Sequence, residues 1–347
     1  MVSESSPGVR PTSRTVTQAP PARRKLKSKP NTSDLVFRAI ARAGGSFVLV
    51  LMLLVGIFLG YRAVGALRVA GWSFVTTHAW NPESSAGSFG IAAVMVGTIL
   101  IALIAIVIAL PLATGAALYI SEYAPRWLQR YLVMVIDLMA AVPSIVYGIW
   151  GWGFLQWRMA SLARWINDWF FWIPLFQVNG ISRHYAGGQT AIFYTSSSFM
   201  AGAVVALMVM PIACSIMRQA FSQAPLGERE GAYALGATRW GMIRAVVIPF
   251  GAGAMVGGTM LGLGRALGET IAVALIISPV FVIQPHVLQT GGSSIASLIA
   301  LRYAEATPFA LSALFAAGLA LFALTLLVNF IAAIIVSRSR SGAVSDA

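Results

Sequence analysis

Six long runs of apolar residues constrain this 347-residue chain more than any other feature of its sequence. They lie at about 46–67, 89–110, 131–153, 191–215, 246–277 and 309–336. A helix rises about 1.5 Å per residue, so about 20 apolar residues cross a hydrocarbon layer roughly 30 Å thick. Each run is long enough, and the sequence therefore predicts an all-α, polytopic membrane protein with about six transmembrane helices. The fifth run is too long for an upright span and must tilt, break or continue outside the bilayer.

The scarcity of charge excludes the main soluble alternatives. Only 10% of the residues are Asp, Glu, Lys or Arg, whereas about 25% is usual in a soluble domain. A disulfide scaffold is excluded because the chain has one cysteine, Cys214. Cys214 lies in an apolar run without a nearby histidine, so we interpret it as a packing residue.

The basic residues predict the orientation of the chain in the membrane. Nine lie ahead of the first apolar run, and eight more fall on the same side if that end is cytoplasmic. These eight are Arg126, Arg130, Arg218, Arg229, Arg239, Arg244, Arg338 and Arg340. The positive-inside rule then places both termini in the cytoplasm, in agreement with an even number of spans. The positive-inside rule accounts for most of the basic residues, so the net charge of +13 does not indicate a nucleic-acid partner.

Two tails flank the predicted membrane-spanning body. Residues 1–34 are basic and poor in bulky apolar side chains, which predicts a disordered tail. This tail is either a solvated topology signal, which we favour, or a contact with anionic membrane lipids. The transmembrane body extends over residues 35–340, and residues 341–347 form a short C-terminal tail.

Tryptophans gather in the outer loop 154–188 and just before it. Six of the protein's ten tryptophans lie between positions 150 and 172, with Arg158, Arg164 and Asp168 among them. Amphipathic aromatic residues settle at the headgroup level of a membrane, so we expect a helix that lies along the outer interface. An aromatic ligand cage is the alternative.

The sequence lacks the local motifs of an enzyme, and no catalytic residue is predicted. It contains no G-x-x-x-x-G-K-[ST] run for ATP and no G-x-S-x-G nucleophile elbow. His78, His184 and His286 are too far apart for local metal-ligand spacing, so no metal site is predicted. A membrane-embedded enzyme stays open only because distant residues can converge in a fold.

The cytoplasmic loop 216–249 has the features of a docking element. Small residues from Gly231 to Ala237 leave a thin helix surface, and Gly236 permits a turn or a helix end. Ile248 and Pro249 are expected to open the next span, since proline is tolerated in a first helical turn. The sequence thus predicts a short helix, a turn and a second helix, which either dock a partner or merely connect two spans.

This loop resembles the cytoplasmic loop of ABC-importer permeases. The shared pattern is E-x-A, three residues, Gly, nine residues and then apolar-x-apolar-Pro, which begins at Glu230. In that family the short helix of the loop sits in a cleft of a separate ATPase subunit. The resemblance implies that Glu230, Ala232 and Gly236 contact the ATPase, within a docking segment that also includes Gly231 and Ala237. Gly231 departs from the family pattern, which usually has alanine there.

Two charges lie deep in the fifth apolar run. Arg265 and Glu269 are four residues apart, which predicts side chains on one face of a helix. A charge at the centre of a bilayer costs about 2.5–3.5 kcal/mol on insertion scales, so the pair should face protein or a water-filled cavity. Either the two charges neutralise each other, or Arg265 offers bidentate donors to an oxyanion while Glu269 orients it. Glycines spaced by four, such as Gly258 and Gly262, predict the close approach of another helix.

One further charge, Asp137, lies near the cytoplasmic start of the third run. We expect it to snorkel or to bond to a neighbouring helix rather than to touch a substrate.

Three blocks narrow the resemblance to the PstC-type permeases of bacterial phosphate ABC importers. They are G-L-G-R-A-L-G-E-T at 262–270, L-Y-I-S-E-Y-A-P at 118–125 and V-P-S-I-V-Y-G-I-W-G at 142–151. The first block alone specifies an oxyanion, because sulfate and molybdate permeases carry a related one. The resemblance extends over residues 35–340 and implies a type I ABC-importer fold in the bacterial plasma membrane.

The resemblance also implies the partners. They are a homologous PstA-type permease, two PstB-type ATPases that bind ATP and magnesium, and an external PstS-type phosphate-binding protein. Membrane lipids are a further expected partner of this chain. This chain itself is expected to hold no cofactor. The remaining alternatives are an ABC permease for sulfate, molybdate or phosphonate, and a secondary anion carrier or channel, which would leave the docking loop without a purpose.

Overall fold

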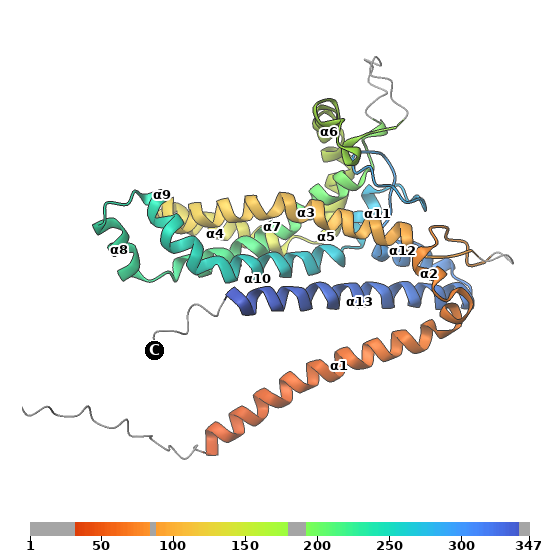
Figure 1. The fold of residues 1–347 in the computed structure, drawn as a ribbon, viewed down its shortest axis with the longest axis horizontal. Coiled ribbons are helices and arrows are strands. Elements are labelled where there is room, and N and C mark those ends of the chain that lie inside the picture. The colour runs from red at the N-terminus through yellow and green to blue at the C-terminus, as the bar shows by residue number, and fades with distance from the viewer. Residues whose placement is uncertain (1–31, 84–87, 180–191, 340–347) are drawn as a thin grey trace, which may run out of the picture. The chain divides into compact units, whose positions relative to one another are not determined.

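The computed structural model describes residues 32–83, 88–179 and 192–339, and helices make up the regular structure of these segments (Figure 1). The β-type pairings among them are isolated bridges. The all-α prediction is confirmed.

The long helices are joined by short helices and by turns of π- or 3₁₀-helix. The α-helices are α1 (Thr32–Ala70), α2 (Ser73–Thr76), α3 (Ala92–Leu118), α4 (Arg126–Ala141), α5 (Ser144–Trp150), α6 (Gln156–Phe170), α7 (Ser198–Ser222), α8 (Leu226–Ala234), α9 (Arg239–Met242), α10 (Ile248–Leu267), α11 (Ile271–Ile276), α12 (Ile295–Arg302) and α13 (Pro308–Ser339). The π-turns are η1 (Tyr119–Tyr123), η2 (Gly151–Leu155) and η5 (Ile243–Val247), and the 3₁₀-turns are η3 (Pro174–Phe176) and η6 (Tyr303–Glu305).

By length and hydropathy, five continuous helices of the described residues can cross a membrane. They are Thr32–Ala70, Ala92–Tyr123, Ser198–Ser222, Arg239–Leu267 and Pro308–Ile335. A sixth span is obtained only if Arg126–Ala141 and Ser144–Phe170 count as one, although they are bent by 90°. Six spans were predicted, and five of them are continuous helices whose ends differ from the predicted ones by one to fourteen residues.

The third predicted span is wrong as a single helix, because it breaks at Val142 and Pro143. Val142 adopts an extended conformation, with ψ at 129°. A proline disfavours the helical conformation of the residue before it and cannot donate a backbone hydrogen bond. The chain therefore ends α4 at Ala141, turns by 90° and starts α5 at Ser144.

The fifth predicted span begins earlier than expected. It also breaks, which is one of the three outcomes expected for a run too long to be an upright span. One continuous helix extends from Arg239 to Leu267, so the expectation that Pro249 opens the span is wrong. Pro249 instead follows the π-turn η5, whose wider hydrogen-bonding pattern is one of the known ways to accommodate a proline in a helix. The helix ends at Gly268, and α11 starts at Ile271.

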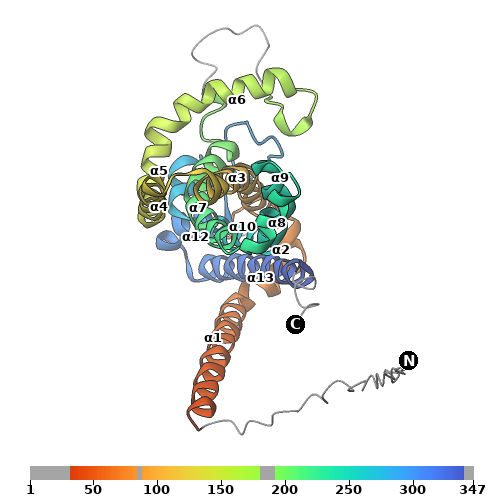
Figure 2. The same cartoon turned by 90° about the vertical axis from the view of Figure 1, so that its left-hand side faces the viewer.

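The core lies between α3, α7 and α10, which are side by side in both views (Figures 1 and 2). Small residues allow this close packing. Gly202 of α7 lies against Ile104 of α3, and Gly258 and Gly262 of α10 lie against α7. The predicted close approach of another helix at the 258–262 glycine pair is thus confirmed. Cys214 is fully buried in α7, as expected for a packing residue.

The chain divides into two compact units, Met1–Leu53 and Leu54–Ala347, and the division falls inside α1. In the second unit, the last turns of α1 pack on α13 through Ser312. The Ser312 hydroxyl donates to the Arg62 carbonyl oxygen at 2.8 Å and accepts from the Ala66 amide at 3.1 Å. Helix α1 includes the last three residues of the predicted basic tail, 1–34. Residues 1–31 of that tail and the whole predicted C-terminal tail, 341–347, lie outside the described residues.

The second unit has two distinct ends. Helices α8 and α9 lie at one end of the α3–α7–α10 bundle, and α2, α6 and α12 lie at the other (Figure 1). The tryptophan-rich segment forms helix α6 as predicted, with Trp157, Trp165 and Trp169 exposed. Its placement along a membrane interface stays a prediction, and residues 180–191 of that loop lie outside the described residues.

The close contact between Gly97 of α3 and the segment before α12 predicts that a larger residue at position 97 lowers the stability of the protein. A Cβ atom at Gly97 would overlap the Ser293 carbonyl oxygen, a backbone atom that cannot rotate away. Gly97→Ala should therefore destabilise the protein by about 1–3 kcal/mol. Melting of the detergent-extracted protein measures this, with Gly115→Ala as the matched control on the same helix, since a Cβ there meets nothing within 4 Å. Equal melting temperatures for the two variants would contradict the packing described here.

Candidate functional site

The segment from Leu226 to Met242 forms the predicted helix–turn–helix. Helix α8 ends in a pair of backbone bonds, from the Gly236 amide to the Tyr233 oxygen at 2.9 Å and from the Ala237 amide to the Ala232 oxygen at 3.0 Å. This is the Schellman pattern, which requires a left-handed residue, and Gly236 supplies it with φ at 81°. The Thr238 hydroxyl then caps α9 by accepting from the Gly241 amide at 3.1 Å.

The predicted docking residues are largely accessible. Glu230, Gly231 and Gly236 are exposed, and Ala232 and Ala237 are half-buried. A Cβ atom at Gly231 would meet nothing within 4 Å, so the departure from alanine at this position has no steric cause within the chain.

The same segment carries exposed apolar side chains that sequence reasoning missed. Leu226, Tyr233, Leu235 and Trp240 are exposed, and Leu235 beside Gly236 is 91% exposed. We call these four residues the apolar tip. The loop composition hinted at a docking element, but residue types alone do not tell which large side chains face outward. A partner protein that covers these side chains would remove their apolar surface from water.

Arg265 and Glu269 are not on one helical face, and this expectation is wrong. Helix α10 ends at Leu267, so Glu269 follows the helix instead of completing its next turn. Glu269 is 8% exposed, and its Oε1 accepts from the Ala272 amide at 3.4 Å at the start of α11. The two side chains form no ion pair within the described residues. Mutual neutralisation therefore does not occur in this structure.

Arg265 is exposed on the last turn of α10. Its guanidinium makes no hydrogen bond to the described residues. The Tyr147 hydroxyl lies within its electrostatic reach and donates to the Met139 carbonyl oxygen at 2.9 Å. A cation is favourable at the C-terminal end of a helix because of the helix dipole. The arrangement thus leaves the planar donors of Arg265 available to an anion or to a partner chain.

Comparison with known proteins shows to which protein family the chain belongs. Residues 109–341 match the model of the family described as binding-protein-dependent transport system inner membrane component. This chain belongs to that family.

The sequence alignments with curated relatives extend over most of this chain. The phosphate transport system permease protein PstC 2 of Mycobacterium tuberculosis is 40% identical over 298 residues, which are 85% of this chain and 89% of the relative. The PstC protein of Xylella fastidiosa strain 9a5c is 38% identical over 307 residues, which are 88% and 91%. That of Pasteurella multocida is 36% identical over 326 residues, which are 91% and 97%.

The chain is accordingly a multi-pass inner-membrane permease component of an ABC transporter and not its ATPase. In such transporters ATP is bound and hydrolysed by a partner subunit, so the permease needs no nucleotide site of its own. Among the described residues, no group of three or more His, Cys, Asp and Glu side chains is placed to hold a metal ion.

Asp137 of this permease component is exposed on α4, and no described residue bonds to it. The predicted bond to a neighbouring helix is therefore not made to the described part of this chain. A bond to another subunit or snorkelling stays a prediction.

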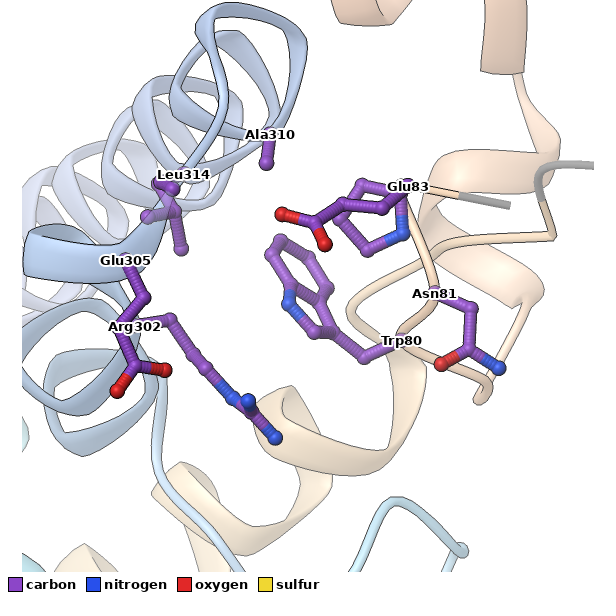
Figure 3. Close-up of a pocket in the computed structure, with 9 residues that line it drawn as sticks. Trp80, Asn81, Glu83, Arg302, Glu305, Ala310 and Leu314 are labelled. Carbon is purple, nitrogen blue, oxygen red and sulfur yellow. The ribbon is translucent and has the colours of Figure 1, made fainter. Parts of the chain in front are cut away.

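A hollow of about 230 Å³ lies away from the predicted sites, at the α12 end of the second unit (Figure 3). It is formed by the segment Trp80–Glu83 and by residues of α12, η6 and α13. The carboxylates of Glu83 and Glu305 flank it together with the Arg302 guanidinium. Two acidic groups against one basic group disfavour an anion, so this hollow is not the predicted oxyanion site.

Proposed function

We propose that this chain is the membrane permease subunit of an ATP-driven importer of inorganic phosphate. The observation that supports this most is the 36–40% identity, over 85–91% of the chain, to proteins named as phosphate transport system permeases. Phosphate also suits the chemistry of Arg265, because a guanidinium binds tetrahedral oxyanions with two parallel hydrogen bonds.

The proposal includes the partners of the complex. A homologous PstA-type permease would complete the translocation path, two PstB-type ATPases would bind below it, and a PstS-type protein would deliver phosphate from outside. Binding of the ATPase is assigned to the segment Glu230–Ala237 and to the apolar tip. The exposure of Leu235 supports this assignment, since an apolar side chain in water gains about 1.5–3 kcal/mol when a partner covers it.

Arg265 is assigned to the phosphate path. It lies in the last turn of α10, just before the helix break that separates α10 from α11. Its guanidinium makes no hydrogen bond to the described residues, so its donors are available to phosphate. Phosphate that passes this point would be attracted by the guanidinium and released toward the cytoplasm when ATP is hydrolysed. Glu269 is assigned a supporting part, because its carboxylate holds the start of α11 at the same break.

Uptake by reconstituted vesicles tests the proposal. The chain is purified with the products of its neighbouring genes, and accumulation of labelled phosphate is measured with and without ATP and the binding protein. We expect accumulation that requires both and that excess sulfate or molybdate does not inhibit. Uptake without ATP would indicate a secondary carrier instead, and ATP-driven uptake of sulfate, molybdate or phosphonate would overturn the substrate.

A further inference from the structure

The end of α3 is held to the cytoplasmic helix–turn–helix by two cationic side chains. Helix α3 continues into the π-turn η1, which contains Glu122 and Tyr123. Arg229 of α8 reaches Glu122, and the Arg239 guanidinium carbon of α9 lies 4.8 Å from the centre of the Tyr123 ring. One contact comes from each side of the turn at Gly236. Both helices of the helix–turn–helix thus contact the same π-turn, η1.

The contact with Glu122 is a buried ion pair. Arg229 Nη1 donates to Glu122 Oε2 at 3.0 Å, and Arg229 Nη2 lies 3.0 Å from Glu122 Oε1. The second of these is a charge contact rather than a well-aligned hydrogen bond. The side chains are 16% and 4% exposed. The hydrogen bond from Nη1 joins two charged groups, and such charge-assisted bonds are stronger than those between neutral groups.

Arg229 also contacts the end of α7. Its Nη2 donates to the Phe221 carbonyl oxygen at 2.6 Å, and Phe221 is fully buried. One guanidinium therefore joins three segments, namely α8, η1 after α3, and the last turn of α7. Helices α3 and α7 form the most extensive helix pair of the second unit.

Helix α8 has no buried residue of its own. Its apolar contact with the bundle is limited to partly buried residues such as Ala232, which packs against the core cluster that includes Ile243 and Val247. A displacement of α8 therefore reaches the bundle through this contact, through Arg229 and through the chain ends of the loop. Stability alone gives no reason for a buried ion pair, because an apolar replacement of the same volume is often as stable. The receiving element is a π-turn, a feature that is frequent at functional sites.

We propose that Arg229 and Glu122 are positioning residues that transmit the displacement of α8 to the ends of α3 and α7. Arg239 on Tyr123 is a weaker, exposed second link. The inference rests on the proposed docking of an ATPase at α8, and it adds the path by which ATP-driven movement of that subunit reaches the transmembrane helices.

The test measures movement and transport separately in the assembled complex. A cysteine is introduced at Ser222, which is exposed at the end of α7, and its maleimide labelling rate is compared with and without ATP. The native Cys214 is buried, so its background is low. We expect ATP to change the labelling rate at position 222. Arg229→Gln and Glu122→Gln should reduce that change, keep the ATPase bound, and lower the phosphate carried per ATP hydrolysed at least tenfold.

Two further variants separate transmission from stability. Arg229→Lys keeps the charge but loses the two separate nitrogens that bond Glu122 and the Phe221 carbonyl oxygen, so it should give an intermediate response. Arg244→Gln removes the same charge from an exposed residue of η5 and should behave like the wild type. A wild-type labelling response and transport ratio in Arg229→Gln would overturn the inference, as would a loss of assembled complex with an unchanged ratio. Absence of phosphate uptake by the unmodified complex would instead overturn the substrate, since the labelling response does not depend on which anion is carried.

Discussion

Replacement of Arg265 by glutamine is expected to lower phosphate uptake about tenfold to a hundredfold while the complex still assembles. Hydrogen bonds to a charged group contribute about 1.5–3 kcal/mol each, and about 1.4 kcal/mol corresponds to a factor of ten. Glutamine keeps a polar side chain at the end of α10 but loses the charge and the fork. Because the Arg265 guanidinium makes no hydrogen bond to the described residues, its loss should leave the fold of the chain intact.

Labelled-phosphate uptake per assembled complex measures this effect. Arg68→Gln is a suitable control, because Arg68 is exposed in the last turn of α1 and its replacement changes the net charge equally. Wild-type uptake by Arg265→Gln would show that the phosphate path does not depend on this guanidinium. Glu269→Gln belongs in the same series, since the amide oxygen can still accept from the Ala272 amide. Loss of uptake in that variant would mean that the negative charge itself is needed.

The long apolar runs made the membrane architecture predictable. The predictions that were wrong concern the break in the third span and the start of the fifth, and each has a local cause. The break in the third run was visible in principle, because Pro143 stands in the middle of it. Length and hydropathy outweighed this proline in the prediction, although a proline disfavours the helix at the residue before it. The start of the fifth span was missed because Pro249 was given too much weight, in contrast to Pro143. We expected Pro249 to lie in the first turn of the span, whereas it follows a π-turn inside a longer helix.

The candidate site shows a sharper limit of sequence reasoning. Spacing by four predicted that Arg265 and Glu269 share a face, but this holds only while the helix continues, and α10 ends between them. Gly236 was predictable, because a left-handed turn strongly favours glycine. The pairing of Glu122 with Arg229 was not, since the two residues are 107 positions apart and no local pattern connects them.

Leu235→Glu is expected to detach the ATPase from the permease and to abolish ATP-dependent uptake. Leu235 is the most exposed residue of the apolar tip, at the turn that the positive φ of Gly236 creates. A covered leucine contributes about 1.5–3 kcal/mol, and a carboxylate in its place adds a desolvation cost of several kcal/mol. The sum corresponds to a loss of binding of more than about a hundredfold. The free permease should be unaffected, because this side chain is almost fully exposed.

Copurification of the ATPase with the permease measures the loss, and two variants define its cause. Leu235→Met keeps an apolar side chain of similar volume and should retain the ATPase. Gly236→Val leaves Leu235 in place but strains the backbone at φ 81°, so it should weaken binding by displacing the turn. If Leu235→Glu copurified with the ATPase in the wild-type ratio, the partner would not cover this tip. Weak binding in Gly236→Val together with full binding in Leu235→Glu would place the contact on the backbone and on Glu230, not on the apolar side chain.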